Sequence, residues 1–158
     1  MGAPLTQGIV DRSRLIFPAL GGLYEIFSPA AYSFMRFAAG AVLLPHGIEK
    51  LMHFSWNTLA PYIEKVMGVP YPMGWAYLAV FAESVCAFCV AVGLFTRLAA
   101  LILLIHMGVI IAWFQWHFGY FWTNKGIEYA LLWWLLFLAI FFRGGGRYSV
   151  DRWLGKEF

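Results

Sequence analysis

The residues of this sequence that could do chemistry are ionisable side chains placed inside apolar stretches. The densest group follows a proline in the segment Leu43-Leu44-Pro45-His46-Gly47-Ile48-Glu49-Lys50-Leu51, at the end of an apolar run. Ionisable groups are costly in lipid, so they usually mark a functional site there. A carboxylate beside an imidazole, which titrates near neutral pH, suits proton transfer to or from a membrane-soluble substrate such as a quinone.

The first apolar stretch places several of these groups on one side of a helix. Within roughly 100° of one another on the helical wheel lie His46, Glu49, Lys50 and His53. Arg36 lies about 40° beyond Lys50 and nearer the opposite end of the stretch. The spacing therefore predicts one polar face, with a separate cation closer to the cytoplasmic side.

Four ionisable residues of the later stretches lie either near the middle of the membrane or near its outer face. Glu83 and His106 fall near the middle of the second and third stretches, counted at about 1.5 Å per residue. His117 follows His106 at helical spacing, and Glu128 begins the fourth stretch at a similar height. Because lipid exposure of each would cost a few kcal/mol, we expect them to face one another. The sequence predicts a polar channel from the middle to the outer face.

Two other interpretations of this polar cluster stay open. Buried ionisable residues in membrane helices can simply pair and hold the bundle together. Four histidines and several glutamates could also supply metal ligands, and haem ligation by His106 with His46 is conceivable at similar depth. No spacing here matches a known metal site, so we predict none.

Cys86-Ala87-Phe88-Cys89 has the two-residue spacing of redox dithiols. In a continuous helix the two side chains lie one turn apart, and a thiolate deep in hydrocarbon is disfavoured. The interpretation we prefer is that both cysteines are small packing residues.

The composition indicates the elements that position these residues. The 158 residues are 62% hydrophobic and 12% charged, whereas a soluble domain carries roughly 25% charged residues. Crossing about 30 Å of hydrocarbon takes roughly 20 apolar residues in a helix. Four stretches approach that length: 30–51, 74–95, 98–118 and 126–142. We therefore predict an all-α fold, a bundle of four transmembrane helices, rather than a β-barrel.

The distribution of charge predicts the topology and the domain limits. The tails and the second loop hold Arg12, Arg14, Arg97, Arg143, Arg147, Arg152 and Lys156, against Lys50, Lys65 and Lys125 on the other side. By the positive-inside rule both termini are cytoplasmic in a bacterial-type inner membrane, and the net charge of +3 reflects topology rather than nucleic-acid binding. We expect an interfacial N-terminal segment over 1–29, a membrane domain over 30–143 and a cytoplasmic tail over 144–158.

The order of several motifs resembles the DoxX family from about residue 32 to residue 153. These motifs are Arg36, Gly40, Pro45 to Leu51, Glu83, Gly93-Leu94-Phe95-Thr96-Arg97-Leu98-Ala99-Ala100, Glu128 to Leu132, and Gly146-Arg147-Tyr148-Ser149-Val150-Asp151. The resemblance implies a small four-helix inner-membrane protein related to the DoxD subunit of thiosulfate:quinone oxidoreductase and to membrane partners of thiol-handling enzymes. The family's polar positions correspond to Arg36, His46, Glu49, Lys50, Glu83 and Glu128.

Three functions remain as hypotheses. The first is a quinone-binding subunit of a membrane oxidoreductase, in which His46, Glu83 and His106 handle protons. The quinone site would then be lined by Arg36, Glu49, Lys50, His117 and Glu128. No nucleotide, flavin or iron–sulfur motif is present, so the electrons would pass through a partner subunit. The second is a membrane anchor within a larger complex or homo-oligomer, and the third, less favoured, is a small transporter.

Overall fold

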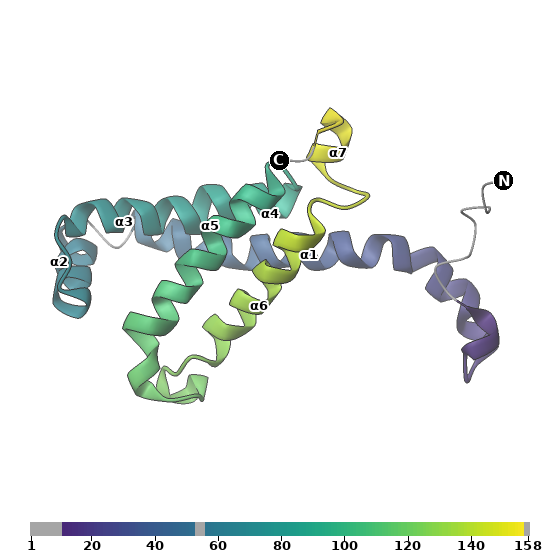
Figure 1. Ribbon diagram of the computed structural model, residues 1–158, viewed down its shortest axis with the longest axis horizontal. Coiled ribbons are helices and arrows are strands. Elements are labelled where there is room, and N and C mark those ends of the chain that lie inside the picture. Colours follow the sequence, from purple (N-terminus) through teal and green to yellow (C-terminus); the bar gives the residue numbers. More distant parts are fainter. Residues whose placement is uncertain (1–10, 53–55, 157–158) are drawn as a thin grey trace.

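The computed structural model describes residues 11–52 and 56–156, and every regular element in these two ranges is helical (Figure 1). The α-helices are α1 (Gly21–Met52), α2 (Trp56–Met67), α3 (Pro72–Phe81), α4 (Ala87–Val92), α5 (Thr96–Val109), α6 (Glu128–Arg143) and α7 (Val150–Leu154). The π-helical segments are η3 (Ala82–Cys86) and η4 (Ile110–Gln115), and the short 3-10 turns are η1 (Arg12–Arg14), η2 (Pro18–Leu20), η5 (Trp116–Phe118) and η6 (Trp122–Asn124). The predicted all-α fold is confirmed for these residues.

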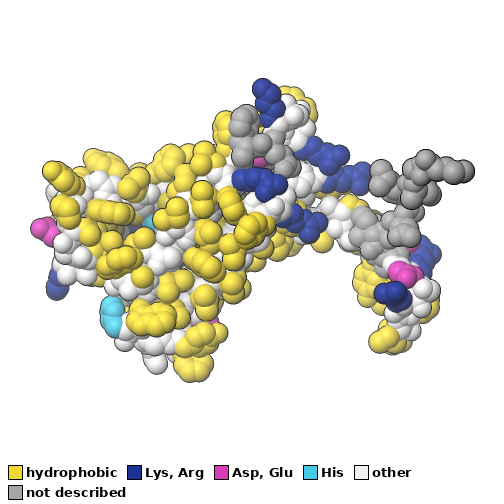
Figure 2. Space-filling view, viewed as in Figure 1, with side chains coloured by type: hydrophobic (Ala, Val, Ile, Leu, Met, Phe, Trp, Pro, Cys, Tyr) yellow, Lys and Arg dark blue, Asp and Glu magenta, His cyan; other side chains and the backbone are white. Residues whose placement is uncertain are grey.

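Three continuous helical stretches are long and apolar enough to cross a membrane. They are Pro18–Met52, Pro72–Val92 and Thr96–Phe118, with 35, 21 and 23 residues. The fourth predicted span corresponds to α6, whose 16 residues extend about 24 Å, short of the roughly 30 Å of hydrocarbon. Hydrophobic side chains cover much of the visible face of the helices (Figure 2). The chain is thus a membrane protein with three spans by length, and the count of four stays a prediction.

Helix α1 begins earlier than the sequence predicted. It runs without interruption from Gly21 and passes through Pro29 and Pro45. Gly21 and Gly22 do not prevent the helix, because they occupy its first turn, where the backbone N–H groups have no intrahelical acceptor. Residue 30 is therefore not a helix boundary, and the segment before it continues directly into the first span.

The segment that follows the first predicted span was expected to be a loop. It forms a short amphipathic helix, α2. In α2, Leu59, Ala60 and Ile63 are buried, whereas Glu64 and Lys65 are exposed. The buried side packs against α3, with Ala76 and Val80 completing a small apolar cluster. This helix lies across one end of α3 (Figure 1), and Leu59, Tyr62 and Ile63 on it line a cavity.

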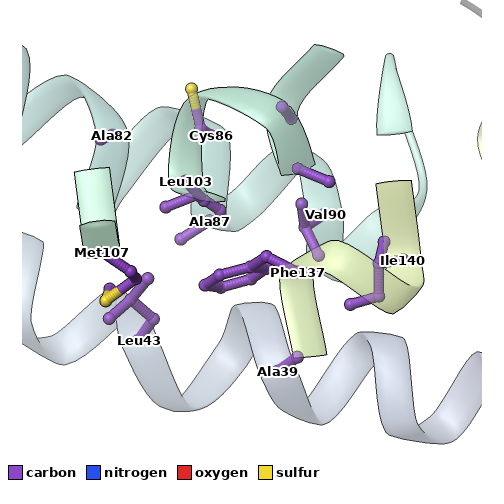
Figure 3. Packing of buried hydrophobic residues seen from close by; sticks show 12 residues of the cluster. Ala39, Leu43, Ala82, Cys86, Ala87, Val90, Leu103, Met107, Phe137 and Ile140 are labelled. Atoms are coloured by element: carbon purple, nitrogen blue, oxygen red, sulfur yellow. The ribbon is translucent and has the colours of Figure 1, made fainter. Parts of the chain in front are cut away.

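The main core lies where α1, α4, α5 and α6 meet. Phe137 of α6 is fully buried at its centre, next to Leu103 of α5 and Leu43 of α1 (Figure 3). Close helix approach depends on Gly40, because a Cβ there would lie 2.3 Å from the carbonyl oxygen of Ala87. α1 is thereby fixed against α4 and η3.

Candidate functional site

Glu83 is the centre of a buried polar cluster formed by three helices. Its side chain, in η3, is 3% exposed. One carboxylate oxygen, Oε1, lies 2.8 Å from Nε2 of His106 in α5. The other, Oε2, accepts a hydrogen bond from Nζ of Lys50 in α1. Two of the predicted proton-handling residues are therefore in direct contact, and Lys50, predicted to bind the quinone, joins them.

The local backbone explains why these side chains meet. Glu83 lies in a π-helical segment, a widened turn that is often found at functional sites. Gly47 allows α1 to approach this turn, because a Cβ on it would lie 2.6 Å from the carbonyl carbon and oxygen of Glu83. Lys50 follows Gly47 by one turn on the same side of α1, and its ammonium reaches the carboxylate of Glu83.

The electrostatics of the cluster depend on the carboxylate. A buried ionised carboxylate is tolerated only when it is paired and hydrogen-bonded, and both oxygens of Glu83 have a donor. Lys50 and His106 are more accessible, with side chains 24% and 14% exposed. In its neutral form the imidazole donates from Nε2 to Glu83, which leaves Nδ1 as an acceptor. Glu83 is therefore the buried centre of the cluster. Lys50 and His106 are its more accessible members and face the adjoining space.

That space is a cavity of about 360 Å³ between α2, α3, η4 and α5. Its size is typical of small-molecule sites, which span roughly 300–1,000 Å³. Its ionisable end is formed by Lys50, Glu83 and His106, and the rest of the lining is aliphatic or aromatic, including Tyr62, Trp75 and Phe114. The cavity can accept a flat, mostly apolar molecule that has a polar group at one end.

His46 and Glu49 do not join this cavity. Both are exposed on α1, and neither lines the cavity. His53, predicted on the same face, lies outside the described residues. Because Gly47 sets the side of α1 that packs against η3, Lys50 is directed to Glu83 while its neighbours are directed outwards.

His117 and Glu128 are also placed apart from the cavity, so the structure does not form the predicted polar channel through them. His117 is exposed and packs its ring 4.3 Å from that of Phe118. Glu128, at the start of α6, accepts a hydrogen bond of 3.1 Å from the backbone N–H of Trp122 in η6. Each of these polar groups therefore has a local environment of its own.

Arg36 occupies a separate buried site at the other end of the bundle. Its guanidinium donates to the carbonyl oxygens of Val90, Ala91 and Tyr148, the last two at 2.8 Å. These contacts satisfy carbonyls at the end of α4, where no further helical turn is available. The structure gives Arg36 a position that joins α1, α4 and the segment before α7, remote from Glu83.

Asp151 is a buried polar residue to which the sequence analysis gave no role, although it ends the last motif that resembles the DoxX family. Its carboxylate accepts from the backbone N–H groups of Phe95 and Thr96 at 2.7 and 2.9 Å, and from the Thr96 hydroxyl at 2.6 Å. It thereby caps the start of α5. The available signal was an acidic residue between two arginines of the tail, Arg147 and Arg152, but its partners lie 55 and 56 residues away.

The two cysteines belong to the packing of α4 and η3. Cys86 is buried in the main core, and Cys89 is half-buried against it as a free thiol. Within 11–52 and 56–156 no three His, Cys, Asp or Glu side chains gather in a group that could hold a metal ion.

Comparison with models of known protein families identifies a family for this chain. The model of the family described as DoxX matches residues 31–116, a range that includes Lys50, Glu83 and His106. No curated protein and no solved structure matches the chain.

Proposed function

The chain belongs to the DoxX family, and we propose that it is an inner-membrane subunit of a redox complex that binds a quinone in the cavity beside Glu83. One observation carries the proposal: an apolar cavity within the spans ends at a buried carboxylate held by an ammonium and an imidazole. A quinone has the matching form, a flat apolar ring with carbonyl oxygens at its edge. The hydrophobic helices around it give such a molecule direct access from the bilayer.

The lining residues fit each part of this ligand. Tyr62, Trp75 and Phe114 offer aromatic surfaces for the ring. Nζ of Lys50 has three hydrogens and uses one on Glu83, so it can donate to a carbonyl oxygen as well. A bound quinone would supply two-electron, two-proton chemistry, with the electrons coming from a redox group on a partner subunit.

Within this proposal Glu83 and His106 act as a pair. Glu83 orients the imidazole through its contact with Nε2. His106 can then exchange a proton at Nδ1 with an oxygen at the polar end of the cavity. The ammonium of Lys50 pairs with the other carboxylate oxygen and balances its negative charge.

The orientation in the membrane is part of the same proposal. Lys and Arg side chains gather near α7 (Figure 2), including Arg143, Arg147 and Arg152. By the positive-inside rule this end and both termini lie in the cytoplasm, so α2 lies on the outer side. The cavity then opens towards the outer half of the bilayer.

Co-purification tests the proposal directly. The protein is extracted from its native membrane with a mild detergent, and bound lipids are measured by mass spectrometry against protein amount. We expect near-stoichiometric quinone with the wild type and with His117→Ala, a histidine outside the cavity, and a loss of at least fivefold with His106→Ala. Equal quinone in all three proteins would contradict the proposal.

A second function, a membrane anchor or assembly subunit, is favoured by one feature of the same site. Both oxygens of Glu83 are already paired inside the chain, as they would be if the cluster served only to join α1, η3 and α5. In that case His106→Ala would lower the yield of the assembled complex, while bound quinone would be absent from the wild type too.

A further inference from the structure

The cavity beside Glu83 has an open side between α3 and α5. Leu78 of α3 and Ile105 of α5 both line the cavity, yet their side chains are 58% and 61% exposed. Trp75, one turn before Leu78, is also exposed and also lines it. A side chain that lines a cavity and is exposed as well lies at its edge. These residues come from the two helices on either side of the space, so they form its mouth.

The order of residues around each helix gives the direction of this mouth. Ile105 immediately precedes His106, so the two lie about 100° apart around α5. Leu78 has the same relation to Ala79 in α3, and His106 and Ala79 both line the cavity. In each helix the residue that follows, about 100° in the other direction, is buried in an apolar cluster. Each helix therefore turns one side to a core, the next to the cavity and the next to the surroundings.

Helix α2 closes the end of the cavity that is remote from Glu83. Leu59 and Ile63 of this helix line the cavity and are buried. Tyr62 is exposed, but its ring lies 5.7 Å from that of Phe114 in η4. α2 therefore contacts both α3 and η4 where α3 and α5 diverge (Figure 1). The mouth that remains is directed sideways, between the two diverging helices.

This mouth lies at the depth of the hydrocarbon. At 1.5 Å per residue, Leu78 is about 9 Å from the start of the span Pro72–Val92. Ile105 is about 14 Å from the start of the span Thr96–Phe118, counted in the same way. Both distances place the residue well inside a layer about 30 Å thick. A molecule in the mouth is therefore surrounded by acyl chains rather than by water.

We propose that the ligand of this cavity carries one long apolar chain, which passes between Leu78 and Ile105 into the bilayer. The inference rests on the proposed function, with the quinone ring inside the cavity and one carbonyl oxygen towards Lys50 and His106. The chain then runs along apolar walls and continues among the acyl chains. A polar substituent in the same place would lose its hydration without gaining a hydrogen bond. The site therefore selects lipid quinones with an isoprenoid or alkyl tail over water-soluble quinones.

Photolabelling in lipid nanodiscs locates the chain. The probe is a benzoquinone with a decyl chain that carries a diazirine at its middle, and labelled peptides are identified by mass spectrometry. We expect labelling of residues 74–78 in α3 and 102–105 in α5, and its displacement by excess decyl quinone without the diazirine. Displaceable labelling confined to other segments, α2 included, would overturn the lateral path alone. Absence of displaceable labelling would overturn the quinone site as well.

A bulky residue at the mouth tests the same path by affinity. Ile105→Trp places an indole across the opening, and Leu132→Trp, on an exposed side of α6 outside the cavity lining, is the matched control. Dissociation constants are measured by competition with the photoprobe. We expect Ile105→Trp to weaken binding of the decyl quinone at least fivefold. Binding of the same ring with a methyl group in place of the chain should weaken less than twofold, because only the chain passes the mouth.

The control and the contrary results are equally defined. Leu132→Trp should bind both quinones as the wild type does. Equal weakening of both quinones by Ile105→Trp, or no weakening of either, would overturn the lateral path while leaving the quinone site in place. Failure of the wild type to bind either quinone would overturn the proposed function and this inference together.

Discussion

Nε2 of His106 lies 2.8 Å from Oε1 of Glu83, although the two residues belong to different helices and are separated by 23 positions in the sequence. Lys50 holds the other oxygen of the same carboxylate. One buried acid therefore joins α1, η3 and α5, and its removal affects the fold and the site together. This double role means that tests of the site need variants that separate stability from ligand binding.

Glu83→Gln tests how much the fold depends on the acid. Glutamine keeps the shape but leaves the ammonium of Lys50 without a counter-charge in a largely buried position. Breaking a buried ion pair in this way destabilises proteins by roughly 3–5 kcal/mol, and the partial exposure of Lys50 places this case at the lower end. Thermal unfolding in detergent, followed by circular dichroism, measures the loss. Glu64→Gln on the exposed side of α2 is the matched control, and equal melting temperatures would contradict the prediction.

Lys50→Met together with Glu83→Gln separates charge from packing. Without the ammonium no uncompensated charge remains, so the double variant should unfold at a higher temperature than Glu83→Gln alone, by about 1–3 kcal/mol in stability. The polar end of the cavity is nevertheless lost, and we expect at least a fivefold reduction in co-purified quinone. A double variant as unstable as the single one would show that the ion pair is not the source of the effect.

Gly47→Ala tests the close contact that places Lys50. The added Cβ would lie 2.6 Å from backbone atoms of Glu83, which cannot move as a flexible side chain would. Overpacking of this kind typically costs about 1–3 kcal/mol, and here it would also separate Lys50 from the carboxylate. Gly74→Ala is the control, because nothing lies within 4 Å of a Cβ at that position. If both variants melt together with the wild type, the approach of α1 to η3 is looser than the structure indicates.

The sequence placed Glu83 and His106 at similar heights on their helices and predicted that they would face one another within a larger polar channel, and the structure shows these two in contact. The directions of several other side chains around their helices could not be predicted. His117 was placed on the same face as His106 by assuming a uniform α-helix, but η4 is π-helical and a 3-10 turn follows it. Each change of helix type alters the angle per residue, so the regular spacing no longer describes one face.

Contacts between segments that are distant in the sequence could not be predicted from the sequence pattern either. Gly47 could be recognised as a small residue, but only the position of η3 shows that it fixes which neighbour faces the cavity. Lys50 consequently faces inwards while His46 and Glu49 face outwards. Local motifs do not contain this information, because it depends on how two helices 33 residues apart in the chain are packed.

Asp151→Asn tests the cap on α5. The amide can keep one acceptor but not the full set of bonds to Phe95 and Thr96, and it adds a donor in a fully buried position. An unsatisfied buried polar group costs about 1–3 kcal/mol. We expect that loss in thermal unfolding, with co-purified quinone unchanged per folded protein because the site near Glu83 is distant. Asp11→Asn, whose acid contacts only exposed neighbours, should behave as the wild type.

Cysteine accessibility in sealed vesicles tests the orientation and whether α6 crosses the membrane. α6 joins exposed Asn124 to the segment that carries exposed Trp153. Its 16 residues extend about 24 Å, which is less than the roughly 30 Å of hydrocarbon. To cross the membrane, α6 therefore needs either a locally thinner bilayer or a contribution from the polar residues at its two ends. We expect Asn124→Cys to react with an impermeant maleimide from the outer side and Trp153→Cys only after the vesicles are opened. Reaction of both from one side would place the two ends of α6 on the same face of the membrane and leave three crossings.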